Sequence, residues 1–228
     1  MPRRRYDQFC AVARALDRVG DRWTLLIVRE LSAGPRRYTD LHADLPGIST
    51  DVLASRLKDM EADELATRRR LPAPASATVY SLTPRGRGLL PVLTALAEWG
   101  APDLAERRPT DAVRPHWFAI PLARRLREAA ATAAGAVTVT TDEGGFRVTW
   151  EADTDPVATG AAAYGTEAAG TAPHPAAEGE PEVVLTAATC VALTGAGLDW
   201  EVGVKEGRIE VRGEGPLADA LRGGAPHA

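Results

Sequence analysis

The sequence predicts a mixed α+β protein made of two domains, residues 1–108 and residues 109–228. In the first domain, closely spaced helical patterns lead into two short strands and a further helix. In the second, alternating β-branched residues predict a strand-rich α/β sheet-and-helix domain. The charge also changes sign: residues 1–110 carry 18 Lys and Arg against 14 Asp and Glu, and residues 111–228 carry 9 against 17. A basic part joined to an acidic part suggests a module facing nucleic acid, although two solvated surfaces would give the same counts.

The bulk properties exclude a membrane protein. The chain is 45% hydrophobic and 25% charged, as in ordinary globular proteins. No apolar run reaches the roughly 18 residues that a bilayer crossing needs, and the basic start at residues 1–5 is not followed by the apolar stretch of a secretory signal. We therefore expect a cytoplasmic protein with no membrane partner.

Catalytic and metal-binding patterns are not found in the sequence. Cys10 and Cys190 lie far apart without metal-ligand spacing, and the four histidines have no partner at such a spacing. There is neither a phosphate-binding glycine loop nor a Ser/His/Asp grouping. We expect reduced thiols, no cofactor, no metal and no enzymatic activity.

The first domain begins with helical patterns. Apolar residues recur at helical spacing in the first segment, at Phe9, Val12, Ala13 and Leu16. Residues 23–31 are apolar almost all round, which indicates a buried helix, and Asp21 is placed to cap it. Residues 38–45 form a short second helix, and Pro46-Gly47 separates it from a third helix over residues 49–63. Two short helices joined by a tight turn are the signature of a helix-turn-helix.

The helix over residues 49–63 has two distinct faces. At about 100° per residue, one arc is apolar and holds Val52, Leu53, Leu57 and Met60. The other is small and polar, and holds Thr50, Asp51, Ala54, Ser55 and Lys58. Small polar side chains let a helix enter the major groove of DNA and bond to base edges. We therefore predict DNA contacts by this face and by Ser49, which opens the helix.

Two strands follow, and we interpret them as a wing. Arg68, Arg69 and Arg70 precede a tip rich in proline and alanine, and Val79, Tyr80 and Leu82 form the returning strand. Strand alternation sends Arg68 and Arg70 to one face, where they would contact phosphates or the minor groove. Thr83-Pro84 then starts a helix whose apolar stripe suggests a dimer interface. That stripe consists of Leu89, Leu93, Leu96 and Ala97.

Residues 10–100 resemble the HxlR-type winged-helix regulators of bacteria. The resemblance rests on blocks in the right order: Cys10, Ala15-Leu16, Gly20, Trp23-Thr24-Leu25-Leu26, Gly34, Arg37-Tyr38, Leu41, Leu45-Pro46-Gly47-Ile48-Ser49, Leu53, Arg56-Leu57, Leu65, Tyr80-Ser81-Leu82-Thr83 and Gly86. Asp21 and Glu64 stand where the family tends to have glycine. The resemblance implies a winged helix-turn-helix that binds an inverted-repeat operator in double-stranded DNA as a homodimer, usually as a repressor and sometimes as an activator.

Other candidate site residues admit two interpretations. Arg56 falls beside Leu53 and Met60, so a structural or phosphate role is favoured over base reading. Arg36 and Arg37 would contact a phosphate or form a solvated pair. Cys10 is either a small packing residue or a thiol that senses electrophiles or oxidants, as in several HxlR-type proteins. Cys190 is expected to be core.

The second domain reads as a sheet with helices. We predict helices over residues 116–131, 187–193 and 217–221, a hairpin of residues 137–140 and 146–150 turned at residues 143–145, and strands over residues 182–186 and 208–212. Residues 155–181 are expected to be a loop with an embedded strand. The ending from Gly207 to Gly213, followed by Pro216-Leu217-Ala218, resembles an SCP2-type, sterol carrier protein-like domain. That resemblance covers residues 117–222 and implies an apolar cavity.

Three functional hypotheses remain open. In the first, the second domain binds an apolar small-molecule effector through aromatic residues, namely Trp117, Phe146, Trp150, Tyr164 and Trp200. In the second, the switch is Cys10 and the acidic domain serves dimerisation or protein interaction. In the third, the second domain is a lipid-type carrier or an enzyme and the winged helix holds a protein partner.

Overall fold

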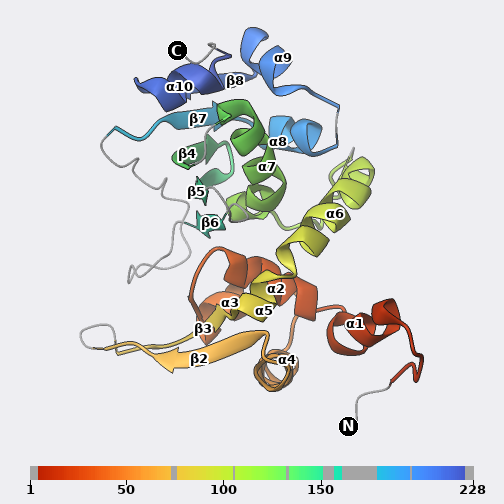
Figure 1. Cartoon of the computed structure of the whole chain (residues 1–228). Coiled ribbons are helices and arrows are strands. Elements are labelled where there is room, and N and C mark those ends of the chain that lie inside the picture. Colours follow the sequence, from red (N-terminus) through yellow and green to blue (C-terminus); the bar gives the residue numbers. More distant parts are fainter. Residues whose placement is uncertain are drawn as a thin grey trace. The chain divides into compact units, whose positions relative to one another are not determined.

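The computed structural model describes residues 5–72, 76–104, 106–131, 134–150, 157–160, 179–195 and 197–223 (Figure 1). The chain forms two compact units, one of residues 1–31 and 35–89 and the other of residues 32–34 and 90–228. The predicted domain boundary at residue 108 stays a prediction, whereas the units change after residue 89. In the described part of the chain, no helix combines the length and the apolar character needed to cross a bilayer.

The first unit contains the predicted helix-turn-helix. Its helices are α1 (Ala11–Val19), α2 (Thr24–Ser32), α3 (Tyr38–Asp44), α4 (Thr50–Ala62) and α5 (Pro84–Arg87). Three predicted helices are confirmed to within a residue at each end, as α2, α3 and α4. Asp21 caps α2, because its carboxylate accepts hydrogen bonds from the N–H groups of Trp23 at 2.8 Å and Thr24 at 3.1 Å. The turn between α3 and α4 passes through Gly47, whose φ of +84° favours glycine.

A three-stranded antiparallel sheet completes the first unit. The strands are β1 (Arg36–Arg37), β2 (Ala66–Arg70) and β3 (Thr78–Leu82), in the order β1-β3-β2. The predicted wing is confirmed as the β2–β3 hairpin, in which Arg68 pairs with Tyr80 and Arg70 with Thr78. The sequence did not predict β1, because two residues are too few for an alternating pattern.

The helix predicted to follow the wing is interrupted. Thr83 caps α5, since its hydroxyl accepts from the Gly86 N–H at 3.0 Å, but α5 ends at Arg87 and α6 (Leu90–Gly100) begins three residues later. The cause is Pro91, which has no amide hydrogen to donate to the Arg87 carbonyl. The prediction of one continuous helix from Thr83-Pro84 was therefore wrong.

The second unit alternates helices and strands. After α6 come η1 (Ala101–Leu104), η2 (Pro115–Phe118), α7 (Ala119–Ala130), β4 (Gly135–Thr141), β5 (Gly144–Trp150), β6 (Val157–Gly160), β7 (Glu182–Leu185), α8 (Ala187–Thr194), α9 (Trp200–Lys205), β8 (Ile209–Arg212) and α10 (Pro216–Leu221). The predicted helix over residues 116–131 is divided into η2 and α7. Residues 155–181 contain the expected strand, β6, and residues 161–178 lie outside the described residues. The short helix α9 was not predicted from the sequence.

The strands of this unit form one mixed sheet in the order β6-β5-β4-β7-β8. β4 and β7 are parallel, and the other neighbouring pairs are antiparallel. Thr141 pairs with Gly144, so the β4–β5 hairpin turns at Asp142 and Glu143, one or two residues before the predicted turn. The core lies between one face of the sheet and the helices, with α7 in contact with β5, α8 and α10. Phe146 is fully buried in this core, and Trp150 and Trp200 are buried there as well.

Candidate DNA-binding surface

Helix α4 is held by its apolar face and presents its polar face to solvent. Leu53, Leu57 and Met60 are buried at the spacing of one helical face. The opposite face is exposed and carries Thr50, Asp51, Ala54, Ser55 and Lys58. Ser49 is exposed as well, and its hydroxyl caps the helix by accepting a hydrogen bond from the Val52 N–H at 3.3 Å. The structure thus brings together the predicted residues of this helix on one rigid surface.

Tyr38 holds the start of α4 against α3. Its phenol donates a hydrogen bond to the Thr50 carbonyl oxygen at 2.7 Å, and its ring stacks with that of His42 at a centroid distance of 6.5 Å. Below this tether, Leu41, Leu45 and Ile48 are buried under the turn. The sequence analysis gave Tyr38 no role in the site, because its partner is a backbone atom twelve residues away that no side-chain pattern reveals.

Arg56 is held by two carboxylates beside the polar face. Its guanidinium lies 2.8 Å from the Asp59 carboxylate, one turn along α4, and 3.6 Å from that of Asp21 at the start of α2. Because Asp21 also caps α2, Arg56 joins the recognition helix to that N-terminus. These contacts favour the structural interpretation of Arg56 over a base-reading one.

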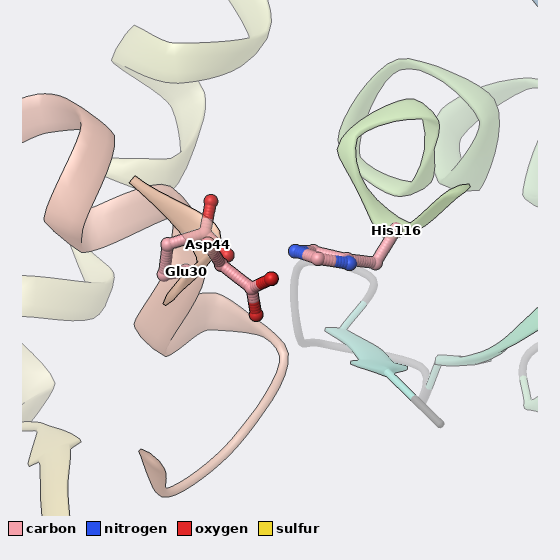
Figure 2. Close-up of side chains that lie close together, drawn as sticks. All are labelled: Glu30, Asp44 and His116. Carbon is pink, nitrogen blue, oxygen red and sulfur yellow. The ribbon is translucent and has the colours of Figure 1, made fainter. Parts of the chain in front are cut away.

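Arg36 is paired with two carboxylates of the first unit. Its guanidinium is 3.6 Å from the Asp44 carboxylate and 3.9 Å from that of Glu30, and its side chain is 6% exposed. Glu30 on α2 and Asp44 at the end of α3 bring their carboxylates close together (Figure 2). The prediction that Arg36 contacts a phosphate is therefore corrected, because the two carboxylates hold its guanidinium.

Arg37 occupies a half-buried position at the N-terminus of α3. Its backbone N–H donates to the Asp40 carboxylate at 3.2 Å, which satisfies one of the amides at the helix start. Its side chain is partly exposed, so a phosphate contact by Arg37 stays a prediction.

The wing presents its arginines to solvent. Arg68, Arg69 and Arg70 are all exposed on β2, and alternation along the strand puts Arg68 and Arg70 on the same face. Across the ladder, burial raises the pKa of Tyr80, while the positive charge of Arg68 acts in the opposite direction. The wing therefore combines a cationic face with a tyrosine that keeps its proton.

The turn from α4 to the wing is formed without the glycine that the family tends to have. Glu64 takes the left-handed conformation with φ of +59°, and the Leu65 N–H donates to the Met60 carbonyl at 2.8 Å. Two contacts hold this turn: the Thr83 hydroxyl donates to the Glu64 carbonyl at 2.5 Å, and Arg18 pairs with Asp63 at 2.6 Å. Because Glu64 has a Cβ atom, this left-handed conformation is strained in a way that it would not be in glycine.

Val52 was assigned to the wrong face. The sequence analysis placed it with the buried residues of α4, but its side chain is 38% exposed. Val52 lies at the edge of the apolar arc, because around the helix axis it is about 100° from Leu53 and further still from Leu57. This position at the edge of the arc was the feature of the sequence that could have indicated the exposure of Val52.

Three of the five aromatic residues expected to bind an effector lie in the interior of the second unit. Phe146, Trp150 and Trp200 are buried in its hydrophobic core, and the Trp200 indole N–H donates to the Leu221 carbonyl at 2.8 Å. Trp117 is partly buried. Tyr164 lies outside the described residues. Three of the five side chains thus have packing roles.

The two cysteines lie in opposite environments. Cys10 is exposed and precedes α1 as its N-cap residue. Cys190 is buried on α8, and burial raises the pKa of its thiol to about 12. The expectation that Cys190 is core is confirmed, whereas the role of Cys10 stays a prediction.

A tight-turned pair of helices with an exposed polar second helix and a cationic hairpin defines a winged helix-turn-helix protein. The HxlR-like helix-turn-helix family matches residues 18–108. The HTH-type transcriptional regulator YodB of Bacillus subtilis (strain 168) is 35% identical over 85 residues, which are 37% of this chain and 76% of that protein. The uncharacterized HTH-type transcriptional regulator YvaP of the same organism is 36% identical over 86 residues, 38% of this chain and 80% of that protein.

This chain belongs to the HxlR-like helix-turn-helix family. Its relatives are transcriptional regulators and not enzymes, in agreement with the expectation from the sequence. A solved structure, the reduced form of YodB, is 32% identical, covers 46% of this chain and 100% of its own, and has a TM-score of 0.38. The family match ends at residue 108, and the SCP2-type resemblance of the second domain stays a prediction.

Proposed function

We propose that the protein binds an inverted-repeat operator in double-stranded DNA as a homodimer and represses transcription. Helix α4 would lie in the major groove, with Thr50, Asp51, Ser55 and Lys58 at base edges and Ser49 near the backbone. Arg68 and Arg70 would contact phosphates or the minor groove through the wing. The observation that carries this proposal is the exposed polar face of α4, held rigidly by its buried apolar face.

Exposed apolar side chains support the dimer. On α6, Leu93 is buried, whereas Val92, Leu96 and Trp99 are exposed, with Trp99 at 80%. On α1, Val12 and Leu16 are exposed at helical spacing, and Phe9 is exposed just before the helix. Monomeric proteins rarely expose large apolar side chains in such rows. A second copy would bury these rows, and a twofold dimer matches an inverted repeat.

A gel-shift titration on the DNA upstream of the protein's own gene tests this proposal. Ser55→Glu puts a negative charge at the centre of the polar face of α4, and we expect it to abolish the shift by repulsion from the DNA. The matched control is Ala188→Glu, which adds the same charge at an exposed position of α8 in the second unit. A retarded band that Ser55→Glu leaves unchanged would contradict DNA contact by α4.

Regulation through Cys10 is a second candidate, favoured by the exposure of its thiol in contrast to the buried Cys190. A Cys10 thiolate would add to the electrophilic carbon of a quinone or aldehyde. The carbon–sulfur bond forms as a π bond of the electrophile breaks, and the displaced electron pair moves to its oxygen, which takes up a proton from water. Treating the wild type and Cys10→Ser with a quinone before the gel shift tests this candidate. Release of DNA by the wild type alone would support it, and equal release by both would exclude it.

An apolar effector in residues 109–228 stays a prediction. The burial of Phe146, Trp150 and Trp200 in the core means that such a ligand would have to displace packed side chains or bind elsewhere in the domain. Tryptophan fluorescence during titration with a long-chain acyl compound tests it. A saturable change together with lower DNA affinity would support an effector, and a flat signal would count against it.

A further inference from the structure

Val52 is the largest apolar side chain exposed on α4, whose other exposed residues are small or polar. It is the third residue of α4, and the structure describes this whole helix. The other large apolar residues of α4, Leu53, Leu57 and Met60, are buried to 1% exposure or less, whereas Val52 is 38% exposed. Part of the Val52 side chain is therefore open to solvent, unlike the apolar residues that anchor α4.

The backbone of Val52 is fixed at the end of α4 that would meet DNA. Its N–H donates to the capping hydroxyl of Ser49 at 3.3 Å, and the Thr50 carbonyl nearby accepts the hydrogen bond of Tyr38. In helix-turn-helix proteins, the N-terminal residues of the recognition helix contact base edges. The isopropyl group is thus presented at a defined place and cannot withdraw by local unwinding without losing both bonds.

Val52 is the largest apolar side chain that α4 exposes, and Ala54 offers only a single methyl. Arg56 lies one turn further along the helix, and its guanidinium is held by Asp59 and Asp21. Ser49 and Thr50, just before Val52, are exposed and carry hydroxyls. A hydrocarbon group at this position can neither donate nor accept a hydrogen bond, so it can recognise only an apolar group on the DNA.

The major-groove edges of the bases carry one apolar group, the C5 methyl of thymine. We propose that Val52 reads a thymine in each operator half-site by van der Waals contact with this methyl. The inference rests on the proposed DNA binding by α4 and adds a base identity to it. Contact of Val52 with the sugar–phosphate backbone is the competing outcome, because it would carry no base preference.

The test compares thymine with deoxyuridine, which differs by the methyl alone and pairs in the same way. A preferred duplex is first selected from randomised DNA with the full-length wild-type protein, and each thymine is then replaced in turn by deoxyuridine. We expect one position in each half-site at which the wild type loses about fourfold in affinity, the effect of one buried methyl-sized group. Val52→Ala should bind the thymine duplex more weakly and show no loss at that position.

Two variants control for indirect effects. Val202→Ala truncates a valine of similar exposure, 44%, on α9 and should keep the full deoxyuridine effect. Val52→Thr keeps one methyl and should retain part of it. The dependence of affinity on salt should be unchanged in Val52→Ala, because no phosphate contact is removed.

The possible outcomes distinguish failure of thymine recognition by Val52 from failure of DNA binding by α4. If Val52→Ala keeps the full deoxyuridine effect, or if no thymine of the selected duplex is sensitive to loss of its methyl, Val52 does not read thymine, although DNA binding by α4 stands. If no duplex is enriched from the randomised pool, the proposed function fails, and the reading by Val52 fails with it.

Discussion

The two units build similar apolar cores but differ in what they leave at the surface. In the first unit, the apolar face of α4 is buried, and small polar side chains and wing arginines remain outside. In the second, aromatic side chains such as Phe146 and Trp150 fill the interior. The polar partners on the sheet of the second unit are engaged with one another, as in the pair of Arg147 and Glu180 at 2.8 Å. The first unit therefore carries the surface that we propose contacts DNA, and the described aromatic and ion-pairing residues of the second unit mostly contact one another.

The same contrast divides the arginines of the first unit. Arg36 and Arg56 each lie near two carboxylates, within 3.9 Å. Arg68 and Arg70 stand exposed on the wing. Residue type alone therefore does not mark a DNA contact, because a nearby carboxylate converts an arginine into a structural element.

Truncating the core of the second unit should have the largest effect on stability. We expect Phe146→Ala to lower the free energy of unfolding by about 3–5 kcal/mol, through the lost burial of the ring and the cavity it leaves. Chemical denaturation followed by tryptophan fluorescence measures this change. DNA affinity of the folded fraction should stay near that of the wild type; a parallel loss of affinity would mean that the sheet unit takes part in recognition.

Removal of the Arg36 cation should have the second-largest effect on the free energy of unfolding. Arg36→Ala leaves Glu30 and Asp44 without that partner, and we expect a loss of about 3 kcal/mol in the free energy of unfolding. Arg37→Ala, next in the chain and half-buried, serves as the control and should cost less than about 1 kcal/mol. Equal thermal shifts for the two variants would place Arg36 at the surface after all.

The wing arginines should affect binding and not folding. Arg68→Ala and Arg70→Ala should each weaken DNA binding several-fold, and each should reduce the slope of log affinity against log salt by about 1. Arg208→Ala, an exposed arginine of the second unit, is the control. Anisotropy titrations at four salt concentrations give the slopes, and slopes identical to the wild type would remove the wing from the interface.

The smallest expected effect is a gain in the free energy of unfolding. Glu64 adopts a left-handed conformation that glycine takes without strain, so Glu64→Gly should raise the free energy of unfolding by about 0.5–1 kcal/mol. Ala62→Gly, in the last turn of α4, should instead lower it by about 1 kcal/mol. Thermal unfolding distinguishes the two. A destabilised Glu64→Gly would indicate that the glutamate side chain contributes more than its strain costs.

The sequence predicted the features that local patterns determine. The helices α2, α3 and α4 followed from apolar periodicity and from the break at Pro46-Gly47, and the wing followed from two short alternating runs. The exposure of the polar face of α4 was also predicted correctly, and the burial of its apolar face was predicted correctly in all but Val52.

The errors concern contacts between distant residues. The burial of Arg36 depends on carboxylates at positions 30 and 44, which meet only when α2 and α3 pack. The tether from Tyr38 to the Thr50 carbonyl depends on the turn geometry. The break between α5 and α6 was the exception, since the lack of an amide in Pro91 was visible in the sequence and was outweighed there by the apolar stripe.

Hydroxyl-radical footprinting of the selected duplex tests the central claim most directly. A homodimer that inserts two copies of α4 should protect two windows related by a twofold axis, with centres about one helical turn, 10–10.5 base pairs, apart. Ser55→Glu should abolish both windows, and Ala188→Glu should leave them in place. Windows without twofold symmetry, or protection that survives in Ser55→Glu, would contradict recognition of DNA by the exposed face of α4.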